Sequence, residues 1–412
     1  MFGPTNRHIA QVFNFVPQIH PRHPLRVAVV TNCIPQYRYP VFKRVIADTP
    51  SRWRFFLSSS SAQTCTDAQR NLPITFCLGL NPQFRNTLHR VGATQREHLP
   101  IPLTLPWHLL AYRPNVIVSG DYGPRSLLCW AIARITGARF IIWSEEISSS
   151  AQGRSRLQAF MRRFLIRRAD AFLPWGQPAA SYLRSMGVAE HTIYKCQQAI
   201  DNDYWVSRAR SLDRRSVRAS KGFCGRVFLL VGRLVERKGF ANFLRAWAKL
   251  PCAARSQCMA VIVGSGEQER ELRQLANDLR LSNVRFDGAK FGDELLPYYV
   301  GADVLVFPSL EDVWGLVVNE ALCCGLPVLA SKYAGASQEL IAGPEADADN
   351  LFDPVDIDAF ARAIGRWVHD GPAIQQESLL AKVRHATHTA SAIAIATAIC
   401  GRPPEQSTSG AT

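Results

Sequence analysis

The sequence predicts an α/β protein with parallel sheets, divided into two domains. The stretch from Phe307 to Ile341 holds an apolar run, a polar loop, a helix that starts near Gly315 and a new apolar run at Val328–Ala330. A strand, a loop, a helix and a second strand are the parts of a parallel α/β unit. The length of 412 residues favours two domains. A hydrophobic content of 47% supplies enough apolar material for two cores.

The alternation of apolar runs and helical stretches divides the chain into five segments. Residues 1–24 hold prolines and histidines without a period, and we expect a loose extension. An N-terminal domain at 25–206, a basic linker at 207–225, a C-terminal domain at 226–375 and a helical segment at 376–412 follow. The linker is expected because that stretch is polar, rich in Arg and Ser, and has no apolar period. Buried strands are expected at 26–32, 54–58, 115–119, 139–143, 170–174, 226–231, 283–287, 303–307 and 328–330, and residues 259–266 are expected to form a strand that runs into a glycine loop.

Charge and cysteine usage restrict the partners and the compartment. The formal net charge of +15 favours acidic partners such as nucleotides, nucleic acid or an anionic membrane surface. Eleven cysteines form no C-x-x-C pair and no zinc spacing, so we expect free thiols in a reducing compartment. The apolar stretch at 9–16 is interrupted by Gln11 and Asn14, which argues against a signal peptide. No apolar run approaches the roughly 18 residues of a membrane span, so we expect a cytoplasmic protein with at most peripheral membrane contact.

The helix that starts near Gly315 is a candidate phosphate site. Its first backbone N–H groups lack intrahelical partners, and the helix dipole is positive at that end. The backbone of Gly315, Leu316 and Val317 is therefore a natural seat for a phosphate. Asp312 lies before this helix and Glu320 lies within it, so two carboxylates could bind hydroxyls at opposite ends of a phosphorylated ligand. Either acid alone would more simply be an ordinary solvated residue.

A second candidate phosphate site follows the strand expected at 226–231. The string from Gly232 to Gly239 reads G-R-L-x-x-x-K-G and leads into a helix with an apolar face. Arg233 offers a planar fork and Lys238 a compact charge, and both suit phosphate oxygens. Without the later motif, a surface turn with two solvated cations would explain these residues as well.

Together, the strings at 232–239 and 307–341 resemble the C-terminal half of the retaining GT-B glycosyltransferases, the group 1 family (family 4). That family has an acidic residue, seven residues and then Glu, followed by a small-residue helix and G-x-P-V, which Asp312, Glu320 and Gly325–Val328 match here. Asp at the first position departs from the commoner Glu, and Glu311 is one residue too early for the spacing. The resemblance implies a GT-B fold, which is two facing Rossmann-like domains with a cleft between them.

The resemblance also implies roles for individual residues. In relatives, the counterparts of Arg233 and Lys238 hold the diphosphate of the nucleotide-sugar donor. Glu320 would bind the ribose and Asp312 the sugar hydroxyls, with donor contacts completed by Gly232, Gly264, Gly288, Gly315, Leu316 and Val317. No metal and no other cofactor is expected, because the D-x-D pairs at 201–203, 347–349 and 356–358 do not follow suitable strands.

The acceptor side is expected at the ends of strands in the N-terminal domain. Tyr37 and Arg38 lie in the loop after the first strand, and Asp121 and Glu145 follow two later strands. The carboxyl ends of parallel strands form the edge where such sheets bind ligands. A proline-rich structural turn would explain Tyr37 and Arg38 equally well. There is no G-x-G-x-x-G, so a dinucleotide fingerprint is absent.

The stretch at 153–168 predicts a basic amphipathic helix. Its apolar residues fall at helical spacing, and its charge comes from arginines. One interpretation is a helix on an anionic membrane surface, and the other is a core-packed helix with a solvated basic face. The apolar set is Leu157, Phe160, Met161, Phe164 and Leu165, and the basic set is Arg154, Arg156, Arg162, Arg163, Arg167 and Arg168.

The sequence thus favours a retaining glycosyltransferase that moves a sugar from a nucleotide sugar to a glycan or lipid-linked glycan of a surface polysaccharide pathway. Two alternatives stay open. A nucleotide-sugar 2-epimerase shares the fold, although its acid and base residues are not recognised here. A non-enzymatic nucleic-acid-binding protein would explain the charge, but no nucleic-acid-binding motif is present, so nucleic acid is not an expected partner.

Overall fold

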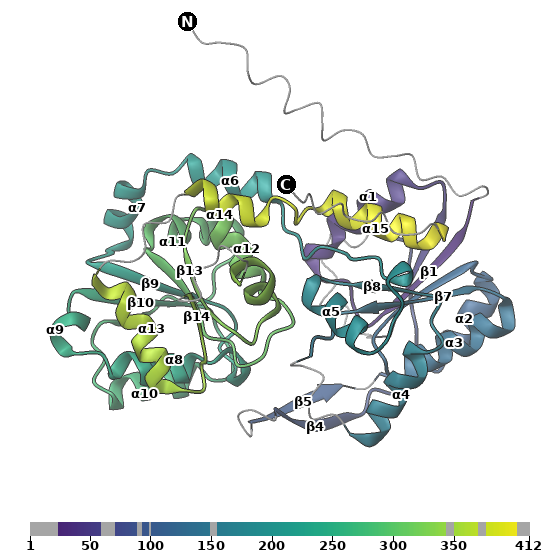
Figure 1. Cartoon of the computed structure of the whole chain (residues 1–412), viewed down its shortest axis with the longest axis horizontal. Helices are drawn as coiled ribbons and strands as arrows, with labels where there is room; N and C mark the ends of the chain where they lie inside the picture. The colour runs from purple at the N-terminus through teal and green to yellow at the C-terminus, as the bar shows by residue number, and fades with distance from the viewer. Residues whose placement is uncertain are drawn as a thin grey trace, which may run out of the picture.

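The computed structural model describes residues 24–58, 71–88, 93–98, 100–148, 155–342, 350–369 and 376–401. Two α/β bodies lie side by side, and each is built on a six-stranded sheet (Figure 1). The extension expected at residues 1–24 lies outside the described residues, apart from Pro24.

The N-terminal sheet has the strand order β3-β2-β1-β6-β7-β8, and every neighbouring pair is parallel. Its strands are β1 (Arg26–Thr31), β2 (Arg52–Leu57), β3 (Ile74–Phe76), β6 (Val116–Gly120), β7 (Arg139–Ser144) and β8 (Ala171–Pro174). Side chains alternate between its two faces, so Val27 and Val29 of β1 enter one core cluster while Ala28 and Val30 enter the other. A separate antiparallel hairpin joins β4 (Gln83–Leu88) and β5 (Ala93–His98).

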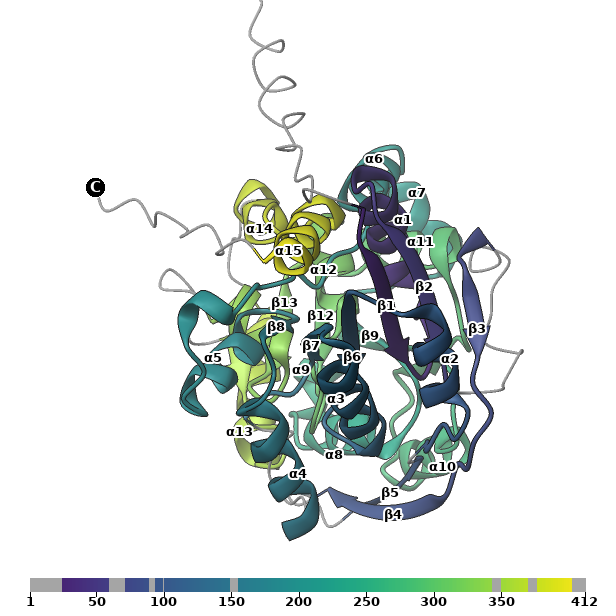
Figure 2. The same cartoon turned by 90° about the vertical axis from the view of Figure 1, so that its right-hand side faces the viewer.

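Helices cover both faces of the N-terminal sheet (Figure 2). One face packs against α1 (Tyr39–Asp48) and α15 (His388–Cys400). The other face is covered by α2 (Leu105–Tyr112), α3 (Pro124–Thr136), α4 (Arg156–Ile166) and α5 (Gln177–Ser185). Parallel strands with helices on both faces place every strand's carboxyl end at one common edge.

The C-terminal sheet repeats the same order, β11-β10-β9-β12-β13-β14, with parallel pairs. Its strands are β9 (Arg226–Val231), β10 (Cys258–Val263), β11 (Val284–Phe286), β12 (Val304–Phe307), β13 (Val328–Ser331) and β14 (Leu351–Phe352). One face carries α8 (Phe240–Ala248), α10 (Glu269–Asp278) and α13 (Ile357–His369), with α9 (Cys252–Arg255) before β10. The other face carries α6 (Asn202–Arg210), α11 (Leu296–Gly301), α12 (Leu316–Cys323) and α14 (Gln376–Val383).

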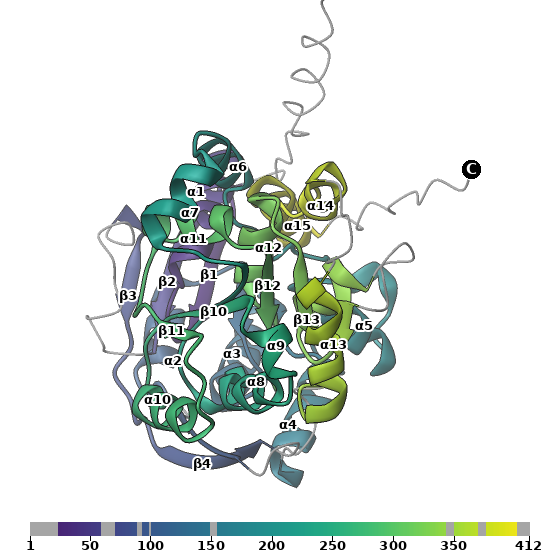
Figure 3. The same ribbon diagram turned by 90° about the vertical axis from the view of Figure 1, so that its left-hand side faces the viewer.

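The segment expected to be an irregular linker, 207–225, is helical. It contains the end of α6 and all of α7 (Arg214–Lys221), and both helices pack near α11 (Figure 3). The Asp213 side chain caps α7 by accepting from the Ser216 N–H at 2.8 Å, and Gly222 ends the helix with φ of 62°. Only Val217 of α7 is buried, so the helix lacks the apolar period that the sequence interpretation required.

The chain returns to the N-terminal domain at its end. Helix α15 packs against α1 and contributes Ala392, Ile395 and Ile399 to the core on that face. The Ser391 hydroxyl and the Gln197 backbone exchange two hydrogen bonds, at 2.8 and 2.9 Å. The two domains are therefore joined twice, once through residues 196–202 and once through the α14–α15 connection.

The apolar and basic faces of α4 differ from those expected. Leu157 and Phe160 are 66% and 67% exposed, whereas Arg162 is buried. Leu165 packs in the core as expected. Across the described ranges, every helix is too short or too polar to span a membrane.

Candidate active site

Three of the four glycines expected at the donor side, Gly232, Gly264 and Gly288, lie together at the carboxyl edge of the C-terminal sheet. The Gly232 N–H donates to the Val263 carbonyl at 3.0 Å, and the Gly264 N–H donates to the Gly288 carbonyl at 2.8 Å. A Cβ on Gly264 would lie 1.8 Å from the Gly232 carbonyl oxygen. The close approach of the two loops therefore requires glycine at position 264. Because glycine has no side chain, it does not cover the backbone at this edge.

Lys238 and Asp312 form an ion pair at the same edge. The Lys238 ammonium donates to the Asp312 carboxylate, and both side chains are largely buried. Burial by itself would raise the pKa of Asp312, but the Lys238 charge, with help from Arg237 and the Trp314 N–H, holds this pKa below its ordinary value. Arg233 is exposed and makes no ion pair with any residue in the described ranges. The structure thus joins one predicted phosphate ligand to one predicted sugar ligand and leaves Arg233 accessible.

Helix α12 begins at Leu316, as the sequence predicts. Gly315 precedes it with φ of 106°, and a Cβ there would lie 2.4 Å from the Phe307 ring. Both the backbone conformation and the ring exclude a larger residue. The turn is therefore tight, and it presents the half-buried Leu316 and Val317 at the positive end of the helix.

Glu320 lies one turn into α12 and faces Tyr299. The Tyr299 hydroxyl donates to Glu320 Oε2 at 2.6 Å. Burial raises the pKa of Glu320 to about 7, although the hydrogen bond from Tyr299 acts in the opposite direction. The charge expected on this side chain is thus only partly present in the free protein at neutral pH.

A pocket of about 530 Å³ lies at the carboxyl edge of the N-terminal sheet and reaches the C-terminal domain. The four acceptor-side residues predicted from the sequence, Tyr37, Arg38, Asp121 and Glu145, all line it. Glu311 and Val313 line it from the C-terminal domain. The structure therefore brings the predicted acceptor residues together and adds two residues from the opposite side of the cleft.

Arg38 is an almost fully buried cation of the pocket. Its guanidinium lies 4.2 Å from the Trp143 ring and 4.3 Å from the Trp175 ring, and the side chain is 3% exposed. Arg38 Nη1 pairs with Glu145 Oε1 at 2.6 Å, and the Trp143 indole donates to the same oxygen at 3.1 Å. One oxygen of Glu145 is thus held by two donors, which orients this carboxylate at the pocket.

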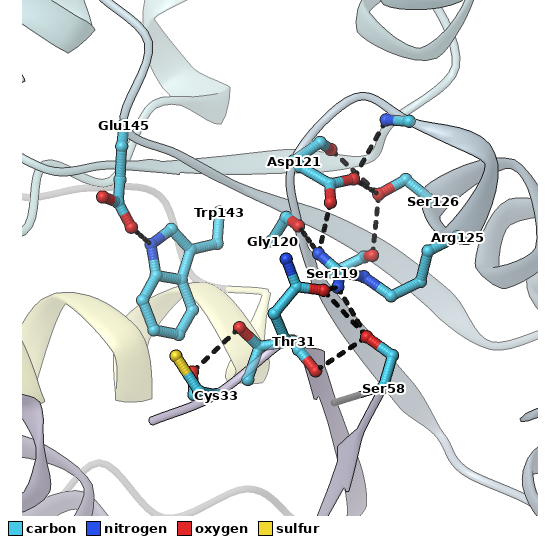
Figure 4. A network of polar contacts seen from close by, with 12 residues as sticks. Thr31, Cys33, Ser58, Ser119, Gly120, Asp121, Arg125, Ser126, Trp143 and Glu145 are labelled. Atoms are coloured by element: carbon cyan, nitrogen blue, oxygen red, sulfur yellow. Dashed lines mark hydrogen bonds and ion pairs between the residues drawn. The ribbon is translucent and has the colours of Figure 1, made fainter. Parts of the chain in front are cut away.

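Arg125 organises the other wall (Figure 4). Its guanidinium donates to Asn32, to Ser58 Oγ at 3.0 Å, and to the Gly120 carbonyl and the Asp121 carboxylate. The Ser126 hydroxyl and the Gly123 N–H also donate to the Asp121 side chain, at 3.0 and 2.9 Å. These contacts hold Asp121 at φ of 113°, a strained conformation for a residue with a Cβ.

Arg162 completes the pocket wall, although the sequence interpretation placed it on a basic face. It pairs with Glu146 at 3.0 Å and donates to the Tyr182 hydroxyl at 2.7 Å. Both members of the ion pair are 9% exposed. Nothing local in the sequence links Glu146 to the side chain of Arg162, which lies 16 residues later in a helix.

The two edges face each other across the cleft. Burial raises the pKa of the Tyr37 phenol against the influence of Arg38, and the negative charges of Glu145 and of Asp312 add to the rise. Asp312 thus acts on a residue of the opposite domain. Along the extended segment before α12, Glu311 and Val313 line the pocket while Asp312 pairs with Lys238.

Contacts between the domains hold this arrangement. The Gln177 N–H, at the start of α5, donates to Glu339 Oε2 at 2.5 Å. The Trp314 indole donates to Asn319 at 2.8 Å, and Asn319 in turn donates to the Gln198 carbonyl at 3.1 Å. A Cβ on Gly176 would lie 2.6 Å from the Trp314 ring. The segment that carries Asp312 is thereby anchored to the N-terminal domain.

Known families and structures match this arrangement. Residues 214–384 match the family described as "Glycosyl transferases group 1". This segment is a group 1 glycosyltransferase domain. It contains Arg233, Lys238, Asp312 and Glu320, so the resemblance to the group 1 family that these motifs predicted is confirmed.

Individual relatives agree with the group 1 assignment. The chain is 28% identical over 210 residues to sulfoquinovosyl transferase SQD2 of Arabidopsis thaliana, a match that covers 50% of this chain and 39% of that protein. It is 34% identical over 147 residues to the lipopolysaccharide core biosynthesis glycosyltransferase LpsE of Rhizobium meliloti, covering 35% and 40%. These matches span about two fifths of the relatives' own length.

The crystal structure of Anabaena Alr3699/HepE in complex with UDP resembles both domains of this chain. The TM-score is 0.65 at 18% identity, over 90% of this chain and 95% of that one. At this identity the likeness concerns the fold alone. The predicted GT-B fold, with the group 1 domain as its C-terminal half, is confirmed.

Proposed function

We propose that this protein is a retaining glycosyltransferase that moves a sugar from a nucleotide sugar to a glycan or lipid-linked glycan acceptor. One observation carries the proposal: the edge of the group 1 domain that bears Lys238 and Asp312 lies opposite a carboxylate-rich pocket on the other domain. Glu311 and Val313 of the group 1 domain line that pocket. A donor held at one edge and an acceptor held at the other would meet in the cleft.

In this proposal, the residues of the group 1 domain have separate roles in sugar transfer. Arg233, Lys238 and the start of α12 stabilise the negative charge that develops on the departing diphosphate. Glu320 accepts from the ribose hydroxyls, and Asp312 from the sugar hydroxyls. The Lys238–Asp312 pair orients both groups before the donor arrives. In the retaining reaction, the acceptor hydroxyl attacks on the face that the diphosphate leaves, and a donor phosphate oxygen takes its proton.

Several observations support the choice of substrates. A neighbour of the same fold was crystallised with UDP, and that nucleotide is the first donor moiety to test. A relative is named for lipopolysaccharide core biosynthesis, which supports an acceptor from a surface polysaccharide pathway. Because the chain's relatives are glycosyltransferases, the epimerase and the nucleic-acid-binding alternatives are not favoured.

A panel of nucleotide sugars tests the proposal. One donor should be hydrolysed slowly without an acceptor, and its nucleoside diphosphate should raise the melting temperature. A ligand at 100 times its dissociation constant adds about 2.7 kcal/mol to the free energy of unfolding. NMR of the transferred sugar should show the anomeric configuration of the donor. A chain that neither binds nor cleaves any nucleotide sugar, or that inverts the anomeric centre, would disprove the assignment.

The proposed chemistry uses cations of the protein and no metal ion. Two basic side chains and a helix dipole can stabilise the leaving diphosphate. Transfer in excess EDTA should therefore proceed at the rate measured without it. Loss of transfer that magnesium or manganese restores would assign this role to a metal instead.

We further propose that α4 contacts the inner face of an anionic membrane. Leu157 and Phe160 are exposed on this helix beside four exposed arginines, and its inner residues Gln158, Met161 and Arg162 line the acceptor pocket. Each arginine near such a surface contributes about 1 kcal/mol. The four arginines are Arg156, Arg163, Arg167 and Arg168.

Co-sedimentation with phosphatidylglycerol vesicles tests this contact. Changing these four arginines in and directly after α4 to Gln should abolish binding, and Leu157→Ser with Phe160→Ser should weaken it. The control changes four exposed arginines outside α4 to Gln, namely Arg210, Arg215, Arg245 and Arg270. Equal loss in both four-fold variants would mean that net charge alone causes binding, and salt-independent binding would exclude the electrostatic contact.

A further inference from the structure

Tyr299 holds one oxygen of Glu320 from a neighbouring helix. Tyr299 lies on α11, is 1% exposed, and donates its hydroxyl to Glu320 Oε2 at 2.6 Å. Its ring packs edge-on against Trp205 of α6, with the ring centroids 5.7 Å apart. The ring is therefore fixed by packing, and the buried hydroxyl finds its partner in the carboxylate. The sequence motif around Glu320 gives Tyr299 no role.

The second oxygen of Glu320 is available to a ligand. No residue in the described ranges donates to Glu320 Oε1, and the side chain is half-buried. Residues four apart lie on one face of a helix, about 6 Å from each other along its axis. Leu316 and Glu320 are related in this way, and the Leu316 N–H is one of the groups without an intrahelical partner. A ligand with a phosphate at Leu316 can therefore offer hydroxyls to Glu320 Oε1.

The Tyr299 hydroxyl remains a donor throughout the neutral range of pH. Burial, and then the negative charge of Glu320, raises the pKa of Tyr299 well above its ordinary value. The same hydrogen bond lowers the pKa of Glu320, although burial has the larger effect and raises this pKa to about 7. The hydrogen bond thus stabilises the carboxylate form of Glu320 against its burial.

Two thiols of the same helix are the other titratable groups beside Glu320. Burial raises the pKa of Cys323 to about 12 and the pKa of Cys324 further, so both thiols stay protonated near neutral pH. The carboxylates of Asp201 and Asp203, at the start of α6, influence Cys323. Among the described residues of this cluster, Glu320 is therefore the group that titrates near pH 7.

We infer that Tyr299 is a positioning residue that holds Glu320 Oε2 so that Oε1 faces the ribose hydroxyls of the donor. This inference rests on the proposed function, because it concerns the ribose contact assigned to Glu320. In this arrangement Tyr299 does not touch the ligand, and it acts by fixing the carboxylate and by favouring its charged form. Trp205 supports Tyr299 from α6, which begins where the chain has crossed between the domains.

Calorimetry with nucleoside diphosphates on the full chain tests this inference. The probes are UDP, GDP and ADP, each with its 2′,3′-dideoxy analogue, measured from pH 6 to pH 9. The unmodified chain should bind at least one ribose form more tightly than its analogue, with an affinity that rises through pH of about 7. In Tyr299→Phe, which keeps the ring, the midpoint should move upward by about one pH unit, because a charged hydrogen bond is lost. Affinity for the ribose form at pH 7 should then fall about fivefold, and affinity for the dideoxy form should not change.

Tyr204→Phe is the matched control. Tyr204 of α6 also donates its hydroxyl to a carboxylate, that of the exposed Asp293, and this variant should keep the midpoint and the ribose preference. In a Glu320→Gln background, Tyr299→Phe should not change the ribose preference further, because Tyr299 acts through Glu320. The inference is overturned if Tyr299→Phe keeps the midpoint and the ribose preference of the unmodified chain, or if it weakens both nucleotide forms equally.

NMR of the free chain separates failure of this inference from failure of the proposed function. With isotope-labelled glutamate, the Glu320 carboxyl signal is identified by its absence in Glu320→Gln. Its titration without nucleotide should move to higher pH in Tyr299→Phe and should not move in Tyr204→Phe. An unchanged titration in a chain that binds nucleotide would overturn the inference alone. A chain that binds no nucleoside diphosphate would overturn the proposed function, and the ribose role of Glu320 with it.

Discussion

The two binding edges of this molecule are assembled from contacts of very different range. On the group 1 domain, the proposed phosphate site comes from two short sequence motifs, and its geometry depends on backbone turns at Gly232, Gly264 and Gly315. On the N-terminal domain, the pocket depends on side-chain pairs between distant segments, such as Arg125 with Asn32, 93 residues apart. The strand order of the two sheets is nonetheless the same.

This difference predicts whether substitutions at each edge affect ligand binding or folding. A backbone N–H at a helix start needs no partner from elsewhere in the chain, so substitutions beside it affect ligand binding more than folding. A buried guanidinium needs its carboxylate, so substitutions in the N-terminal pocket should affect folding first. Three predictions test this contrast, beginning with the largest expected effect.

Replacement of Arg162 by Gln should destabilise the N-terminal domain strongly. The change removes the ion-pair partner of Glu146, and both side chains are 9% exposed. Loss of one member of a buried pair costs about 3–5 kcal/mol. Chemical denaturation should show this loss, whereas Arg163→Gln, an exposed neighbour on the same helix, should change stability by less than about 0.5 kcal/mol. Similar values for the two variants would contradict the structural role of the pocket arginines.

Replacement of Arg233 by Ala should reduce turnover without an effect on folding. Its guanidinium is exposed and unpaired among the described residues, and it is expected to contact charge that develops in the transition state. Loss of such a contact costs a factor of roughly 100 or more in turnover. Lys238→Ala should lower turnover similarly and also lower stability, because Asp312 loses its partner. Near-normal turnover in both variants would remove the diphosphate role, and the exposed Arg245→Ala on α8 is the control.

Replacement of Glu320 by Gln should weaken nucleoside diphosphate binding about tenfold above pH 7, since charged hydrogen bonds contribute about 1.5–3 kcal/mol. The pKa of Glu320 is raised to about 7 by burial. In the unmodified chain, nucleotide affinity should therefore rise with pH through this value as the carboxylate forms. Stability of the free chain should change in the opposite sense. A carboxyl whose folded pKa is raised favours folding at low pH, and this contribution is lost as pH rises from its ordinary pKa through 7.

Calorimetry from pH 6 to pH 8 checks this prediction. The Glu320→Gln variant should show a flat pH profile over the same range, because its amide does not titrate. A profile that keeps its slope in the variant would assign the titration to another group. Tyr299→Phe is a useful second variant, since it removes only the hydrogen bond to Glu320.

Most of the secondary structure could be predicted from the sequence. The strand at Arg226–Val231 has the expected bounds, and helix α12 begins directly after Gly315. These elements are long or strongly apolar, or are bounded by glycine. The sequence interpretation missed β3 and β14, which have three residues and two, because strands of that length carry no period. It also missed α7, whose caps at Asp213 and Gly222 were the only local signal.

The sequence by itself determined the group 1 domain of this protein. The proposed phosphate site in that domain consists of local turns and a helix start, so its residues lie close together in the sequence. Only the tertiary structure decided that Arg162 is buried, that Glu145 is held by Arg38, and that Glu311 reaches the opposite domain. These facts depend on which segments the fold brings together and on the direction of each side chain. Neither property is encoded in the spacing of residues along the chain.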